Sequence, residues 1–154
     1  MQDKETISNE ERLYRSVRGE LRENEYTYDS TGRLKIRSNA FRDRNKKPSV
    51  DRASLLEFNP VLSKLNVSDG IVTLLTAEVR AIGDVTTRVD ETSVEHKVDV
   101  EYAPLEQNPA HAQIVVRPEY LGSKTKQENA FHLLRVALAR LATINGWTLR
   151  PGED

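Results

Sequence analysis

The chain has no cysteine among its 154 residues. Disulfides, thiolate zinc sites, iron–sulfur clusters and cysteine nucleophiles are therefore all excluded. It also lacks any apolar run near the roughly 20 residues that a membrane-spanning helix needs. The first twelve residues contain no apolar core of a secretory signal peptide. We therefore expect a cytoplasmic protein without a membrane-spanning segment.

Motifs that bind cofactors or carry catalysis are also missing. The sequence contains no GxGxxG, P-loop, HExxH, GxSxG or EF-hand pattern. Three scattered histidines without cysteine argue against a structural zinc site, and no carboxylate spacing points to magnesium. We expect no metal and no cofactor, so any catalysis should be metal-independent.

The composition fits one domain with a modest core. Hydrophobic residues make up 37% and charged residues 31% of the chain, and the net charge is −1. A chain of this length and apolar content typically forms a single domain. We expect a flexible, polar tail over residues 1–10 and one α+β domain over residues 11–150.

Positive charge is concentrated in one stretch, residues 33–52. This stretch has eight basic residues against two acidic ones. The basic residues are Arg33, Lys35, Arg37, Arg42, Arg44, Lys46, Lys47 and Arg52. Since the chain as a whole is almost neutral, this local excess predicts an anionic ligand or partner more directly than the net charge does.

Alternating apolar residues predict most of the strands. Residues 11–18 fit a strand slightly better than a helix, and residues 24–38 predict a hairpin that turns at 29–32. Residues 94–102 and 110–116 predict two antiparallel strands joined by a loop of about eight residues.

Other segments leave more room for interpretation. Residues 49–56 predict a short strand or the lead into a helix, and residues 71–82 a long strand with a helix as the alternative. Asn59-Pro60 predicts the start of a short helix with an apolar side. That side would comprise Val61, Leu62 and Leu65. The polar residues 83–93 predict a loop.

The last element is predicted to be an amphipathic helix of about 20 residues. Thr125 and Glu128 form a capping-box pattern, and Gly146 is a plausible C-cap. Apolar residues recur between them at helical spacing, up to Ile144. The expected fold is therefore α+β, a small and mostly antiparallel sheet packed against this helix and one shorter helix. Surplus apolar residues on the helix are compatible with a homodimer.

The basic stretch supplies the first candidate binding residues. Arg33, Lys35 and Arg37 would share one face of a strand, while Leu34 and Ile36 point inward. Ser38 and Asn39 add neutral donors, and Phe41 could stack on a base or fill the core. The adjacent pairs Arg42-Asp43 and Asp51-Arg52 would either close a loop by salt bridging or orient an arginine toward phosphate. The alternative is a solvated strand face without a ligand.

The histidines supply the second candidate. His132 is expected at the surface and His96 as a hydrogen-bonded core residue. His111 opens a strand directly after Asn108-Pro109, and alternation places Gln113 on the same face. A histidine and an amide two residues apart suit a general acid or base and a ligand-orienting group. A histidine that caps a strand end is the alternative.

Four short motifs resemble a family of short, uncharacterised bacterial proteins. They are E-R-L-Y-R-S-V at 11–17, S-N-A-F-R-D-R at 38–44, S-V-D-R-A at 49–53 and P-A-H-A-Q-I at 109–114. The resemblance spans most of the chain and implies no activity. It groups seven residues into one recurring set: Arg15, Ser38, Phe41, Arg42, Asp43, Ser49 and His111.

Together these patterns predict a site for a phosphate-bearing ligand, a nucleotide, a signalling oligonucleotide or RNA. If the site is catalytic, it would suit a metal-independent phosphodiesterase. His111 would exchange a proton, Arg42 and Arg52 would stabilise charge on phosphate, and Ser38 and Gln113 would position it. The alternatives are a non-enzymatic adaptor or inhibitor that docks a basic face on an acidic partner, and ADP-ribosyl-type chemistry.

Overall fold

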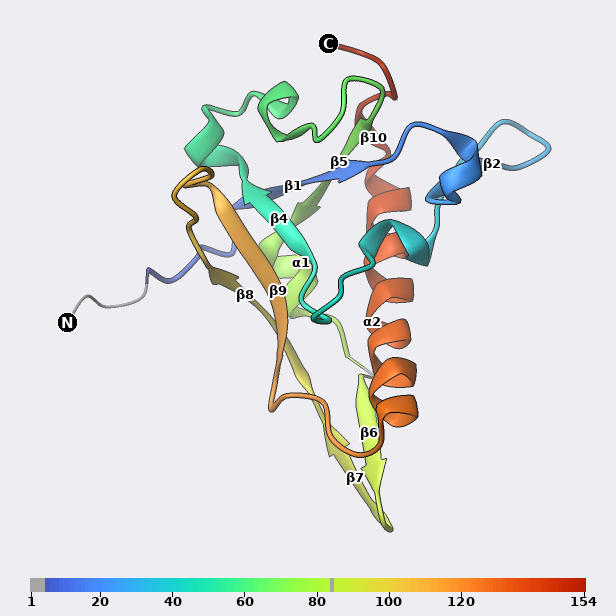
Figure 1. Ribbon diagram of the computed structural model, residues 1–154, viewed down its shortest axis with the longest axis vertical. Helices are drawn as coiled ribbons and strands as arrows, with labels where there is room; N and C mark the ends of the chain where they lie inside the picture. The colour runs from blue at the N-terminus through green and yellow to red at the C-terminus, as the bar shows by residue number, and fades with distance from the viewer. Residues whose placement is uncertain (1–4, 84) are drawn as a thin grey trace.

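The computed structural model describes residues 5–83 and 85–154, and its main element is a six-stranded antiparallel sheet (Figure 1). In spatial order its strands are β10 (Trp147–Leu149), β5 (Gly70–Leu75), β1 (Arg12–Val17), β4 (Ser49–Arg52), β9 (His111–Arg117) and β8 (Lys97–Tyr102). The long helix α2 (Lys124–Asn145) packs on one face, and the short helix α1 (Thr76–Arg80) follows β5. The predicted α+β class is confirmed.

Side chains alternate between two differently covered faces of this sheet. On the inner face, Leu13 and Ile114 belong to the main core together with Leu134 and Leu138 of α2. On the outer face, Tyr14 and Ile71 form a smaller apolar cluster. Residues 53–69, which contain the 3-10 turns η3 (Ala53–Leu56) and η4 (Pro60–Ser63), cover that cluster.

The ends of α2 differ in how well the sequence marks them. The N-cap is Ser123, whose hydroxyl accepts a hydrogen bond from the Lys126 amide at 3.2 Å. The capping box predicted at Thr125 and Glu128 is therefore wrong by two residues. Gly146 is confirmed as the C-cap, since its amide donates to Ala142 at 2.9 Å and its φ is 74°.

Two hairpins extend from the sheet. β2 (Tyr26–Tyr28) and β3 (Leu34–Ile36) form the predicted one, and it lies beside α2. β6 (Thr86–Val89) and β7 (Thr92–Glu95) form a second where a polar loop was predicted. That prediction failed because tertiary contacts stabilise the hairpin, while its polar sequence lacks the alternating apolar residues that predict strands. Thr87 is buried and bonds to His96 across the chain reversal.

Two segments for which the sequence allowed either a strand or a helix contain both, one after the other. The strand predicted over 71–82 ends at Leu75, and α1 takes the second half because Thr76 bonds to the Glu11 carbonyl through its amide and its hydroxyl. Residues 49–56 contain a strand and then η3. β10, which was not predicted, pairs with β5, and its Trp147 ring would lie 2.7 Å from a Cβ at Gly70.

The start of the domain lies earlier than predicted. Of the predicted tail, residues 1–4 lie outside the described residues, whereas Ile7 is buried in the main core. The Asn9 carbonyl accepts from Ala77, and its side chain accepts from Arg80 at 2.7 Å. These contacts attach Asn9 to α1. No helix among the described residues is long and apolar enough to cross a membrane.

Candidate functional site

The basic stretch divides into paired and unpaired charges. Four of its eight cations have carboxylate partners: Arg42 with Glu25, Lys46 with Glu128, Lys47 with Glu119 and Arg52 with Glu11. Arg33, Lys35 and Arg37 form no ion pair within residues 5–83 and 85–154. The uncompensated charge is therefore concentrated on and beside β3.

These three residues help to line a cavity of about 590 Å³ between β3 and α2, which we call the basic groove. Its polar lining consists of Arg33, Lys35, Arg37, Arg140, Ser38, Thr143 and Asp29. Its apolar lining consists of Leu34, Ile36, Val136, Ala139 and Ile144. The volume lies within the range of small-molecule sites in proteins.

The hairpin and α2 hold the two walls together. The Ile36 amide donates to the Thr143 hydroxyl at 2.9 Å, and that hydroxyl donates to the Ala139 carbonyl at 2.8 Å. Because neighbours on a strand face opposite ways, burying Ile36 directs Lys35 and Arg37 outward. The predicted division of β3 into a basic face and an apolar face is confirmed.

The turn of the hairpin fixes the groove's one carboxylate. The Asp29 side chain accepts bonds from the Thr31 hydroxyl at 2.6 Å, the Thr31 amide at 2.8 Å and the Arg33 amide at 2.9 Å. The Thr31 hydroxyl, followed by the Arg33 amide, lowers the pKa of Asp29. The carboxylate therefore stays ionised and belongs to the turn, leaving four cations against one anion along the groove.

The groove combines two chemistries. Its lining includes three arginines and one lysine, and a guanidinium matches phosphate with two parallel hydrogen bonds. The rest of the lining is largely aliphatic, and Ile144 is 72% exposed there. Sequence reasoning missed Arg140 and assigned Ile144 to the core. The signal was present, since Val136, Arg140 and Ile144 recur at four-residue spacing on a helix whose apolar stripe is wider than one face can bury.

Arg15 and Phe41, predicted to bind ligand, are structural. Arg15 donates to three carbonyls, those of Ala40 at 3.0 Å, Ser49 at 2.8 Å and Arg42 at 3.1 Å. Burial lowers the pKa of Arg15. Phe41 is fully buried in the main core and cannot stack on a base.

Asn39 and Asp43 stabilise the local backbone. Asn39, in the 3-10 turn η2 (Ser38–Phe41), donates to the Glu23 carbonyl of η1 (Leu21–Glu23) at 2.9 Å. Asp43 accepts from the amides of Asn45 and Lys47, both at 2.9 Å, so it closes the loop without orienting Arg42. Of the seven residues that the resemblance groups together, Ser38 is the one that lines the basic groove.

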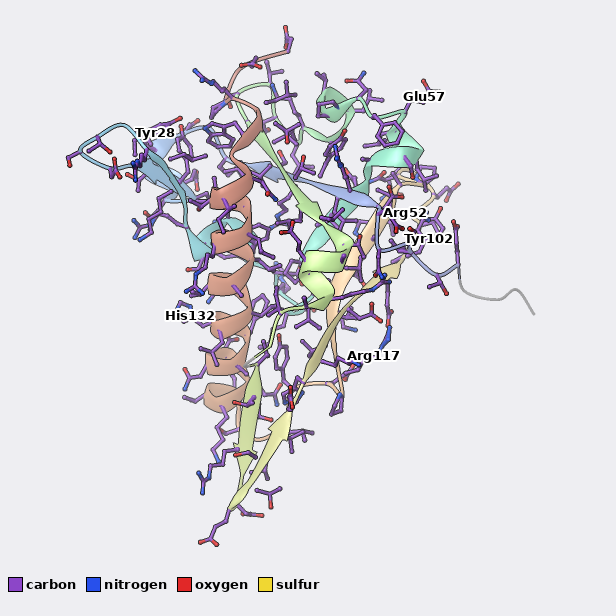
Figure 2. All side chains as sticks on the ribbon, turned by 180° about the vertical axis from the view of Figure 1, so that it is seen from behind. Tyr28, Arg52, Glu57, Tyr102, Arg117 and His132 are labelled. Carbon is purple, nitrogen blue, oxygen red and sulfur yellow. The ribbon has the colours of Figure 1, made fainter. Side chains whose placement is uncertain are left out.

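Arg52 lies far from the groove. It is buried, its Nε donates to Glu11 at 2.9 Å, its Nη1 lies 3.1 Å from Glu5, and its guanidinium stacks over Tyr102. Figure 2 shows Arg52 beside Tyr102 and, on the other side of α2, Tyr28 of the hairpin. The predicted pairing of Arg52 with Asp51 is wrong because adjacent strand residues face opposite ways.

His111 lies on the outer face of the sheet. Its Nδ1 lies 2.7 Å from the Ala103 carbonyl, which only accepts, so Nδ1 bears the hydrogen. In the neutral ring Nε2 then accepts from the Ser49 hydroxyl at 3.1 Å. Gln113 is also on this face, in register with Ser49. Since Ala112 and Ile114 pack toward α2, His111 faces away from the basic groove.

The other two histidines agree with expectation. His96 is buried, its Nδ1 donates to the Pro118 carbonyl at 2.6 Å, and its Nε2 accepts from Thr87. His132 is exposed on α2. Within the described part of the chain, no group of three or more His, Asp or Glu side chains is arranged to hold a metal ion.

A smaller cavity of about 440 Å³ lies under the loop that follows Phe41. Its cationic lining residues are Arg44, Lys46 and Lys47. Both lysines are ion-paired, and Glu119 also lines the cavity. This cavity therefore has less free positive charge than the basic groove.

Comparisons of the chain with protein-family models, with curated proteins and with solved structures gave no match in any of the three.

Proposed function

We propose that the protein binds a phosphate-bearing ligand, a nucleotide or a short oligonucleotide, in the basic groove. The observation that carries this proposal is the convergence of Arg33, Lys35 and Arg37 with Arg140 around one cavity, none of them neutralised by an ion pair among the described residues. A cytoplasmic setting, predicted from the sequence, is part of this proposal.

The two-part lining favours a nucleotide over inorganic phosphate. Phosphate groups would contact the guanidinium groups of the lining, and a base or sugar would cover Val136 and Ile144. A nucleotide uses both kinds of residue, while inorganic phosphate uses the basic ones alone. We therefore expect nucleotides to bind more tightly than phosphate.

Catalysis gains less support than binding. His111, the predicted acid or base, faces the opposite side of the sheet, and its two ring nitrogens are engaged by Ala103 and Ser49. The phosphodiesterase hypothesis stays a prediction, and chromatography of the ligand after incubation tests it. Recovery of intact ligand would indicate that the protein binds the ligand without cleaving it.

The test is a thermal-shift panel of nucleotides and cyclic oligonucleotides, followed by calorimetry with the best ligand. Arg140→Ala and Arg37→Ala should each weaken binding about tenfold, the value of one charge-assisted hydrogen bond. Arg44→Ala is the matched control, because it removes the same charge from the same stretch but outside the groove. It should change affinity less than about twofold.

Other outcomes would contradict the proposal. An equal loss of affinity in Arg44→Ala would move the ligand to the loop cavity or reduce binding to nonspecific charge attraction. No stabilisation by any nucleotide would favour the adaptor hypothesis, in which the same basic residues meet an acidic protein surface.

A further inference from the structure

The segment between β4 and β5 exposes an unusual amount of apolar surface. Six large apolar side chains are exposed there, to between 37% and 81%. They are Leu55, Phe58, Val61, Leu62, Leu65 and Val67, which we call the apolar patch. In Figure 1 this segment, drawn in green after β4, lies at the opposite end of the molecule from the β6–β7 hairpin. The short helix predicted at Asn59-Pro60 was expected to have Val61, Leu62 and Leu65 on its apolar side, and these three side chains are exposed.

The backbone is strained at the point where it presents Phe58. Glu57 and Phe58 both have left-handed backbones, with φ of 53° and 58°. A non-glycine residue in this region costs on the order of 1 kcal/mol or more. The Phe58 amide still bonds to the Ala53 carbonyl at 2.9 Å, so the turn is well formed and holds a 64% exposed aromatic ring. Such strain is common at functional surfaces.

We propose that the apolar patch is the contact surface between two copies of this chain. With about 150–200 Å² for each whole side chain, the exposed fractions amount to roughly 600 Å² of apolar area. This is at the upper end for patches on monomers, and it approaches the roughly 800 Å² per partner of a standard interface. The exposed area of these six residues is therefore comparable to the apolar area that one partner of a stable dimer buries.

The charges of the segment fit a second copy better than a charged partner. Residues 54–67 contain one acid, Glu57, and one base, Lys64. In a twofold dimer each surface meets itself, so Glu57 of one copy can face Lys64 of the other. Lys64 donates to the Glu153 carbonyl at 2.8 Å, and its ammonium keeps two further donors. A site for an acidic or a basic protein would carry an excess of one sign.

The first experiment is light scattering and sedimentation of the full chain across nanomolar to high micromolar concentrations. The protein should be a dimer, and the double variant Leu62→Asp, Leu65→Asp should raise the dissociation constant about 100-fold or more. The matched control is Leu133→Asp, Ile144→Asp on α2, whose side chains are similarly exposed. This control should remain dimeric.

A charge exchange keeps the test independent of folding defects. Glu57→Lys and Lys64→Glu should each weaken the dimer several-fold, and the double exchange should restore it. Circular dichroism should be the same for all variants. A wild-type protein that is monomeric at every concentration would overturn the proposal, as would a dimer lost in the α2 variant but kept in the patch variant. Failure of the double exchange to restore the dimer would refute the pairing of Glu57 with Lys64.

Discussion

Replacing Arg15 by methionine should destabilise the fold without removing a charge from the basic groove. The guanidinium holds the carbonyls of Ala40, Arg42 and Ser49 at 2.8–3.1 Å, so it joins β1 to the segment that leads from η2 into β4. Methionine keeps most of the length and apolar contact of the arginine stem but donates no hydrogen bond. The substitution therefore isolates the three bonds.

The expected loss follows from those bonds. A hydrogen bond from a charged donor contributes about 1.5–3 kcal/mol, and an acceptor left without a partner costs about 1–3 kcal/mol when buried. Two effects reduce the sum, because a partly buried carbonyl can accept from water and because the cost of burying the guanidinium disappears. We expect a net loss of about 3 kcal/mol, a large share of the roughly 5–15 kcal/mol that stabilises a typical domain.

Urea unfolding followed by circular dichroism measures this loss directly. Arg44→Met is the matched control, since Arg44 is exposed and bonds to none of these carbonyls, and it should stay within about 0.5 kcal/mol of the wild type. Nucleotide affinity of folded Arg15→Met should be unchanged. A loss below about 1 kcal/mol, accompanied by weaker ligand binding, would refute the structural role and return Arg15 to the predicted ligand site.

Three further predictions concern other residues. Phe41→Ala should cost about 3–5 kcal/mol of unfolding free energy in the same assay, because the ring is fully buried; a loss under 1 kcal/mol would contradict that packing. Burial raises the pKa of Glu11, but hydrogen bonds from Ser54 and Arg52 outweigh it, so the pKa is lowered on folding. The resulting stability is present above the unfolded pKa of about 4.3 and is lost as pH falls through the lower folded value. The difference in unfolding free energy between wild type and Glu11→Gln, about 2 kcal/mol at neutral pH, should therefore disappear in acid. A difference that does not change with pH would contradict this. His111→Ala should leave nucleotide affinity by calorimetry within about twofold, because the ring faces away from the groove; a larger loss would restore His111 to the site.

The elements with strong local patterns were predictable. The recurrence of apolar residues toward the C-terminus gave α2, and the alternation over 110–116 gave β9. The strand predicted over 94–102 is interrupted at His96, so that its first two residues belong to β7 and the rest forms β8. β10 has three residues. Its Trp147 pairs with Val72 of β5 and places its ring against Gly70, and no local sequence pattern encodes these contacts. The β6–β7 hairpin was missed for the same reason. Its polar sequence predicts a loop, and the hairpin is held by contacts such as the hydrogen bond between Thr87 and His96.

The sequence predicted one of the two walls of the basic groove. Alternation on β3 identified Arg33, Lys35 and Arg37 as one exposed basic face. Their partner wall depends on α2 lying beside the hairpin, which brings Arg140 next to residues more than 100 positions earlier in the chain. No spacing rule joins residues so far apart, and the cavity exists only once the two elements pack.

The sequence by itself determined the α+β class, the long helix, most of the strands and the location of excess positive charge, because these depend on neighbours within a few residues. Tertiary structure decided which charges are free. It buried Arg52 against Glu11, committed Arg15 to three carbonyls, turned His111 to the opposite face and left the apolar side of η4 exposed. The physical reason is that an ionic or apolar side chain acquires its role from what surrounds it in space, and those surroundings come from distant parts of the chain.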